Sequence, residues 1–260
     1  MGGLGPRVEH APGEIPLVRT GRSGTAGASR VDQITVKDTQ TRGCFLVFKD
    51  RIEAGRKLAG ALSQLKDRDV VVLGIPRGGV VVANEVAKAL GAPLDVVVTR
   101  KIEAPEEPEY ELGAVTQEGD VIMDRESAES LGASAGYLEE QIRLKRTEVK
   151  ERLERLRGGG PYPSLEGKVV VIVDDGIATG SSVSAAVMSV KKRKPKEIVV
   201  AVPVAPSDAV QLLSDDGTKV VCLLTPGPFL AIGEFYEDFR QVEDIEVKRI
   251  LDESRARLDA

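Results

Sequence analysis

The sequence predicts an α/β protein whose central parallel β-sheet is covered by helices on both faces. Short runs of valine, isoleucine and leucine recur along the chain. They are nearly continuous instead of alternating with polar residues, which is typical of strands buried on both faces. Segments with helical spacing of apolar residues separate these runs, the order expected for a parallel sheet. The length of 260 residues, 42% of them hydrophobic, is enough for one sizeable domain.

The alternation of helices and strands begins near residue 49. A helix over 49–65 places four apolar residues near helical spacing, namely Ile52, Leu58, Leu62 and Leu65. Strands of the sheet are predicted at 69–76, 93–99, 168–174, 197–205 and 219–225. Helices are predicted at 78–90, 181–193, 207–215 and 244–260.

Two regions depart from this alternation. Residues 1–43 are rich in Gly, Pro, Ser, Thr and Arg, so we expect a flexible N-terminal extension followed by one domain over 44–260. In the middle of the chain, two short strands at 111–116 and 120–124 precede a long charged helix at 134–157, which the glycines at 158–160 end.

Composition excludes several classes of protein. Lys and Arg number 36 against 41 Asp and Glu, which gives no support for nucleic-acid or acidic-membrane binding. No apolar run approaches the roughly 20 residues that span a bilayer, and the N-terminus does not resemble a signal peptide. With one histidine, His10, and two distant cysteines, Cys44 and Cys222, a zinc site and a histidine triad are excluded. We therefore expect a soluble cytoplasmic protein.

The segment VVVIVDDGIATGSS, residues 169–182, predicts a phosphate site. It places glycines and hydroxyl residues between a strand and the start of a helix, where backbone N–H groups favour an anion. It is neither a P-loop nor a dinucleotide motif. The paired carboxylates of Asp174 and Asp175 suit the 2′ and 3′ hydroxyls of a ribose 5-phosphate, which would donate hydrogen bonds to them. The alternative is an acidic helix cap.

This segment resembles the phosphoribosyl-pyrophosphate (PRPP) motif of type I phosphoribosyltransferases. The likeness runs from about Phe48 to the C-terminus and is closest to predicted, little-characterised members that carry LGIPRGGVVVA and RKIEAPEEPEYELGA. It implies a type I phosphoribosyltransferase-like fold, with a small hood and lid beside the sheet. It also implies that Asp174 and Asp175 are catalytic. The residues implied to bind the 5-phosphate are Gly176, Ile177, Ala178, Thr179, Gly180, Ser181 and Ser182.

Two further segments fit the same resemblance. GIPRGG lies where these enzymes hold pyrophosphate, which assigns that role to Pro76, Arg77, Gly78 and Gly79; a plain tight turn is the alternative. Arg100 and Lys101, predicted to close the strand at 93–99, are implied to be catalytic cations. The acidic segment at 102–112 matches the position of the mobile loop that closes over the site.

The segment PFLAIGEFYEDF, residues 228–239, is similar to the loop that binds base and metal in purine phosphoribosyltransferases. The similarity implies base contacts from Phe229, together with Ile177 of the phosphate motif. A packed aromatic turn is the alternative interpretation. The residues implied to bind Mg²⁺ or its waters are Asp174, Asp175, Glu234 and Asp238.

The resemblance implies a Mg²⁺-dependent pentosyltransferase that transfers the 5-phosphoribosyl group of PRPP to a nitrogenous base. A purine is favoured, as in purine salvage, and a homodimer is implied. The alternative is a regulatory protein of the same fold that binds PRPP or a nucleotide without turnover. A PRPP synthetase shares the ribose-phosphate motif, but it would need a second, related domain, and the sequence shows no repeat.

Overall fold

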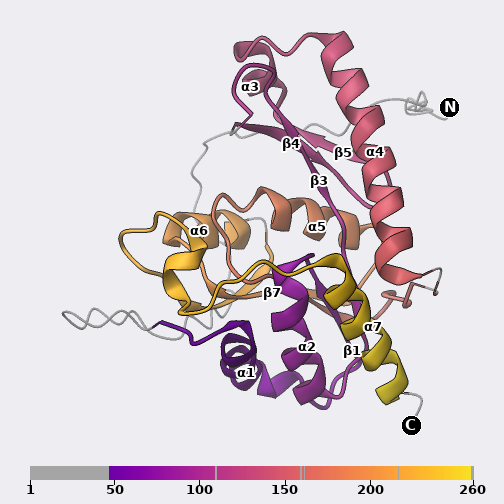
Figure 1. The fold of residues 1–260 in the computed structure, drawn as a ribbon, viewed down its shortest axis with the longest axis vertical. Helices are drawn as coiled ribbons and strands as arrows, with labels where there is room; N and C mark the ends of the chain where they lie inside the picture. Colours follow the sequence, from indigo (N-terminus) through magenta and orange to yellow (C-terminus); the bar gives the residue numbers. More distant parts are fainter. Residues whose placement is uncertain (1–46, 109, 159, 161, 216, 259–260) are drawn as a thin grey trace, which may run out of the picture.

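Five parallel strands form the centre of the molecule (Figure 1). The computed structural model describes residues 47–108, 110–158, 160, 162–215 and 217–258. The strand order is β2-β1-β6-β7-β8, and every neighbouring pair is parallel. This confirms the predicted central parallel sheet. The strands are β1 (Val70–Gly74), β2 (Leu94–Val96), β6 (Val169–Val173), β7 (Glu197–Val204) and β8 (Lys219–Leu224).

Helices cover both faces of this sheet, as predicted. Successive strand residues point to opposite faces, so Val70 and Val72 belong to one buried cluster and Val71 and Leu73 to the other. Residues of α1, α2, α4 and α7 join the first cluster, and residues of α5 and α6 join the second. The helices are α1 (Arg51–Ala61), α2 (Gly78–Leu90), α4 (Ala135–Arg157), α5 (Ser181–Lys191), α6 (Ser207–Asp215) and α7 (Asp244–Leu258).

A second, smaller sheet projects from the main one and is antiparallel, with the order β3-β4-β5 (Figure 1). Its strands are β3 (Arg100–Glu103), β4 (Glu111–Val115) and β5 (Val121–Met123). The sequence predicted β4 and β5 but not β3, nor the short helix α3 (Arg125–Ser130) that follows them. The predicted loop at 102–112 therefore includes the ends of two paired strands.

The long helix α4 lies along the small sheet and reaches the main sheet (Figure 1). Ser134 caps its start by accepting a hydrogen bond from the Tyr137 backbone N–H, and Gly158 ends it in the left-handed conformation with φ +62°. Two short 3₁₀ helices, η1 (Ser63–Leu65) and η2 (Ile232–Phe235), complete the regular structure.

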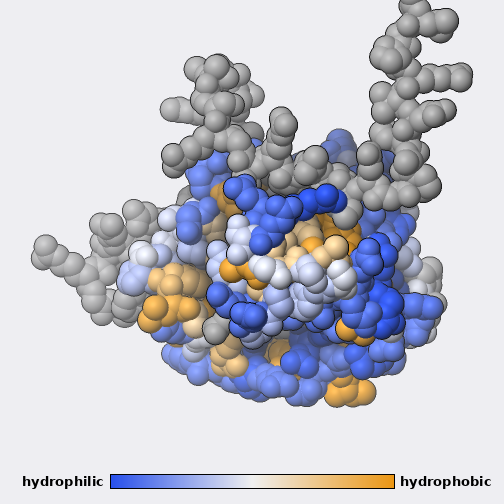
Figure 2. All heavy atoms as spheres, turned by 90° about the horizontal axis from the view of Figure 1, so that it is seen from above, coloured by the Kyte–Doolittle hydropathy of each residue, from blue (hydrophilic) through white to orange (hydrophobic). Residues whose placement is uncertain are grey.

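The surface is mainly hydrophilic where it can be seen from above, and hydrophobic residues appear there as separate patches (Figure 2). Within the described residues, no helix is long and apolar enough to cross a membrane. The predicted extension at 1–43 and the two residues His10 and Cys44 lie outside the described residues. Cys222 is buried, and this burial raises the pKa of its thiol to about 12.

Candidate functional site

The segment from Asp174 to Ser182, called the phosphate loop below, connects the carboxyl end of β6 to the start of α5. Gly180 adopts φ +86°, a conformation that favours glycine, and this places it as the N-cap of α5. The first backbone N–H groups of a helix have no partner within the helix, so those of Ser181 and Ser182 are available to an anion. Thr179 and Ser181 add hydroxyls whose oxygens lie 3.1 Å apart. The loop thus has the donors that a phosphate needs.

The two adjacent acids of the loop have different surroundings. Asp175 accepts a hydrogen bond from Arg51 Nε at 2.7 Å, and both side chains of this ion pair are largely buried. Asp174 instead accepts one from the backbone N–H of Asp175 at 2.9 Å. Burial, and after it the neighbouring charge of Asp175, raise the pKa of Asp174 well above its ordinary value. The pair therefore combines one carboxylate neutralised by Arg51 with one that favours its protonated form.

The start of α2 lies directly against these acids. A Cβ atom at Gly78 would collide with the Asp175 carboxylate, and one at Gly79 would lie 2.7 Å from Asp174 Oδ1. The preceding peptide, Pro76–Arg77, is cis. The predicted pyrophosphate segment and the predicted ribose acids are thus brought together, and only glycine allows this close approach.

The sequence predicts that Arg100 and Lys101 close a strand of the parallel sheet, but they do not. They begin β3 of the small sheet. Arg100 Nε lies 3.2 Å from Glu148 of α4, and Lys101 contacts Glu111 of β4. Burial lowers the pKa of Lys101, and the charges of Glu103 and Asp174 oppose that effect.

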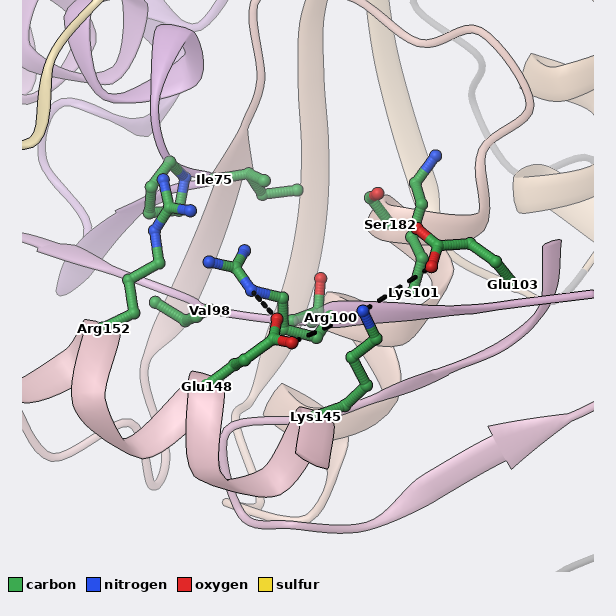
Figure 3. A pocket seen from close by; sticks show the side chains of 11 residues that line it. Ile75, Val98, Arg100, Lys101, Glu103, Lys145, Glu148, Arg152 and Ser182 are labelled. Atoms are coloured by element: carbon green, nitrogen blue, oxygen red, sulfur yellow. Dashed lines mark ion pairs between the residues drawn. The ribbon is translucent and has the colours of Figure 1, made fainter. Parts of the chain in front are cut away.

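A cavity of about 310 Å³, called the cationic cavity below, opens between β1, β3 and α4 (Figure 3). Pro76, Arg100, Lys101 and Ser182, all predicted site residues, are part of its lining. The residues that α4 contributes to the lining are not predicted from the sequence. These are Lys145, Glu148 and Arg152. Their spacing of three and four residues places them on one face of a helix, but the sequence does not show which face meets the site.

The segment 228–239, called the base loop below, packs against the phosphate loop. A Cβ atom at Gly176 would lie 2.6 Å from Ile232 Cγ2. Phe229 stacks on Phe235 with ring centroids 5.4 Å apart. Ile177 is buried in the core cluster beside α5, so its side chain packs inside the protein; a base contact for it remains a prediction.

The predicted metal ligands do not form one cluster. Glu234 and Asp238 are exposed, and Asp238 accepts a hydrogen bond from the backbone N–H of Arg240 at 3.0 Å. In the described part of the chain, no group of three or more His, Cys, Asp or Glu side chains has the arrangement of a metal site. A metal ion here would need most of its ligands from a substrate or from water.

Two residues that the sequence analysis did not single out connect the base loop to the acids. The Tyr236 hydroxyl donates a hydrogen bond of 2.6 Å to the Asp175 carbonyl oxygen. The Arg51 guanidinium lies 3.9 Å from the centroid of the Phe239 ring and donates to the Arg240 carbonyl oxygen. Arg51 and Asp175 are 124 residues apart in the chain, so no local sequence pattern could have predicted their contact.

These features define an α/β protein that has an anion-binding loop, an acid pair and a cationic cavity at the carboxyl edge of its parallel sheet. A family model for the phosphoribosyl transferase domain matches residues 49–226. The chain belongs to this family of phosphoribosyl transferases.

Curated proteins and a solved structure are both similar to this chain. Two Mycobacterium tuberculosis proteins, each named "Putative phosphoribosyl transferase", are 43% identical over 206 residues, which is 79% of this chain and 46% of theirs. The chain thus spans about half the length of these curated relatives. The crystal structure of TT1426 from Thermus thermophilus is 45% identical, with a TM-score of 0.70, and the match covers 80% of this chain and 98% of that one.

Proposed function

We propose that the chain transfers the 5-phosphoribosyl group of PRPP to a nitrogenous base and releases pyrophosphate. One observation carries the proposal: the phosphate loop, the acid pair and the cationic cavity adjoin one another at a single edge of the sheet. PRPP carries a 5-phosphate, two ribose hydroxyls and a diphosphate on C1. Each of these groups finds a matching set of donors or acceptors there.

The residues support a mechanism based on positioning and electrostatics. The N-terminus of α5 and the hydroxyls of Thr179 and Ser181 hold the 5-phosphate. Asp175, paired with Arg51, accepts hydrogen bonds from the ribose hydroxyls. As the C1–O bond to the diphosphate breaks and the C1–N bond forms, the cations of the cavity stabilise the departing diphosphate.

A magnesium ion fits this site as part of the substrate complex. Mg²⁺ usually takes one or two carboxylates and completes its shell with substrate phosphates and water. Burial, and after it the charge of Asp175, raise the pKa of Asp174, so a cation beside Asp174 would offset the cost of ionising it. When bound, the ion neutralises charge on the diphosphate.

The acceptor proposed is a purine-like base. Its support is the similarity of the base loop to that of purine phosphoribosyltransferases and the position of Phe229, which lies on the loop that packs against the phosphate loop. From the same resemblance we propose a cytoplasmic homodimer.

The second candidate is a regulatory protein that binds PRPP or a nucleotide without turnover. One observation favours it: the Glu111 carboxylate contacts both the Ser181 hydroxyl and the Lys101 ammonium group. An internal carboxylate thus already bridges two groups proposed to bind substrate phosphates. A substrate must displace Glu111 before it can use them.

The test is release of pyrophosphate from PRPP with Mg²⁺ and pooled nucleobases. We expect Asp174→Asn and Asp175→Asn each to lower the rate about 10²-fold or more, because each replaces a carboxyl group proposed to bind the ribose hydroxyls with an amide. Asp252→Asn, which changes an acid on α7 that pairs with Lys248, is the matched control and should leave the rate unchanged.

The outcomes separate the two candidates. Turnover with at least one base, lost in both site variants, supports the transferase. Binding of PRPP without turnover on any base supports the regulatory protein. Rates in both site variants equal to that of the unsubstituted protein would contradict the roles given to the acid pair.

A further inference from the structure

The face of α4 that meets the site is cationic. Lys145 and Arg152 project from this helix into the cationic cavity, opposite Arg100 and Lys101 of β3 (Figure 3). These four cations face only two carboxylates in the lining, those of Glu103 and Glu148. Glu111 and Asp244, which lie outside the lining, pair with Lys101 and Arg152, so the lining itself stays cationic and suits an anion.

Arg152 is the most enclosed of these cations. Its side chain is 12% exposed, and its ion pair with Asp244 is long, at 3.4 Å from Nη2. Its Nε atom is buried without a hydrogen-bond partner. Burial, and after it the charge of Arg100, lower the pKa of Arg152. Burying a guanidinium with so few partners lowers the stability of the fold, and an anion bound in the cavity would offset that loss.

The carboxylates of the lining do not form an ion pair with Arg152. Glu148 already lies 3.2 Å from Arg100 and 3.5 Å from Lys145. Arg77, whose charge also acts on Arg152, has no side-chain hydrogen bond or ion pair with any residue that the structure describes. The charges of Arg100 on β3 and of Arg77 in the loop after β1 thus both act on Arg152 of α4. Among these three guanidinium groups, only that of Arg100 pairs with a carboxylate of the lining, Glu148.

We propose that α4 contributes a diphosphate-binding residue, Arg152, to this cavity, with Lys145 as a second cation. The inference rests on the proposed function, because PRPP is the source of the diphosphate there. Ser182 of the phosphate loop lines the same cavity, so one ligand can occupy both the α5 N-terminus and the cations of α4. The planar fork of arginine suits bidentate contact with phosphate oxygens. A volume of about 310 Å³ suits a small ligand.

The test is calorimetric binding of three probes with Mg²⁺: PRPP, inorganic pyrophosphate and ribose 5-phosphate. Arg152→Gln should weaken both diphosphate-containing probes about 10- to 100-fold, as expected for loss of one charge-assisted contact. Binding of ribose 5-phosphate should change less than about 3-fold, since that probe lacks the group that Arg152 binds. Arg152→Lys should recover part of the loss, because it restores the charge without the fork.

Arg155→Gln is the matched control. Arg155 belongs to the same helix and pairs with the same Asp244, but its side chain is 62% exposed and it is not part of the cavity lining. It should bind all three probes as the unsubstituted protein does. Circular dichroism of each variant verifies that it is folded.

The results distinguish a failure of the role given to Arg152 from a failure of the proposed function. If Arg152→Gln binds pyrophosphate and PRPP normally, or loses all three probes equally while folded, the role of Arg152 is wrong and the proposed function stands. If the unsubstituted protein binds neither PRPP nor pyrophosphate, the proposed function fails, and this inference fails with it.

Discussion

Replacing Gly79 with alanine tests whether α2 must lie against the acid pair. The added Cβ atom would lie 2.8 Å from Asp174 Cα, 2.8 Å from the Val173 carbonyl oxygen and 2.7 Å from Asp174 Oδ1. The first two atoms are backbone of β6 and its end, so no side chain can rotate to make room. The helix start or the phosphate loop must shift instead.

The size of the effect follows from two opposing contributions. Overpacking of this kind costs about 1–3 kcal/mol, while alanine gains about 0.5–1 kcal/mol over glycine within a helix. The net loss in the free energy of unfolding is therefore about 1 kcal/mol at the middle of both ranges, with limits of about 0 and about 2.5 kcal/mol. For a protein of this size, about 1 kcal/mol corresponds to about 2–4 °C in Tm, so Gly79→Ala should melt about 2–4 °C lower.

Gly60→Ala is the matched control for this change. Gly60 also lies in a helix, α1, but an added Cβ atom there would have no heavy atom within 4 Å. It should raise the stability by about 0.5–1 kcal/mol. The same substitution thus has opposite signs at the two sites.

The assay is thermal and urea unfolding of both variants, with PRPP binding measured on the folded protein. We expect Gly79→Ala to weaken PRPP binding, since Asp174 is displaced, and Gly60→Ala to leave it unchanged. The reasoning is refuted if Gly79→Ala is as stable as Gly60→Ala and binds PRPP as tightly.

Two further predictions concern the acids themselves. Because burial raises the pKa of Asp174, the folded state holds its proton more tightly than the unfolded state does. The contribution of Asp174 to the free energy of unfolding therefore falls as the pH rises above about 3.8. Asp174→Asn should therefore gain stability relative to the unsubstituted protein between about pH 4 and neutral pH; a difference independent of pH would contradict this. Arg51→Met leaves the largely buried Asp175 without its partner and should cost about 3 kcal/mol in urea unfolding. Arg56→Met, which removes an exposed partner of Glu85 and leaves its pair with Lys88, should cost less than about 1 kcal/mol; equal losses would exclude a special role for Arg51.

The sequence predicted the parallel sheet and the phosphate loop because both depend on local patterns. The valine-rich run at 169–173 is one strand, and the glycine and hydroxyl residues after it begin the next helix. Strands buried on both faces leave a strong signal in composition, and helix starts depend on a few adjacent residues. The family resemblance then proposed a ligand for the loop, and the family match confirms the resemblance itself.

The strand β3 could not be predicted in the same way. Its four residues, Arg100–Glu103, include only one that is fully buried, Ile102. Such a segment forms a strand because β4 pairs with it, which is a tertiary effect. For the same reason the sequence placed Arg100 and Lys101 at the end of a parallel strand. The contribution of α4 was missed because charged residues surround most of that helix, and only the fold selects the face that meets the site.

The sequence alone does not show how the two acids of the pair differ. Asp174 and Asp175 are identical and adjacent, so no pattern distinguishes them. The fold does so by bringing Arg51 from α1 to Asp175, and by surrounding Asp174 with protein and a second negative charge. Arg51 in turn packs on Phe239 of the base loop. A movement of the base loop would therefore reach Asp175 through Phe239 and Arg51. These two side chains connect the proposed acceptor site to the proposed ribose site.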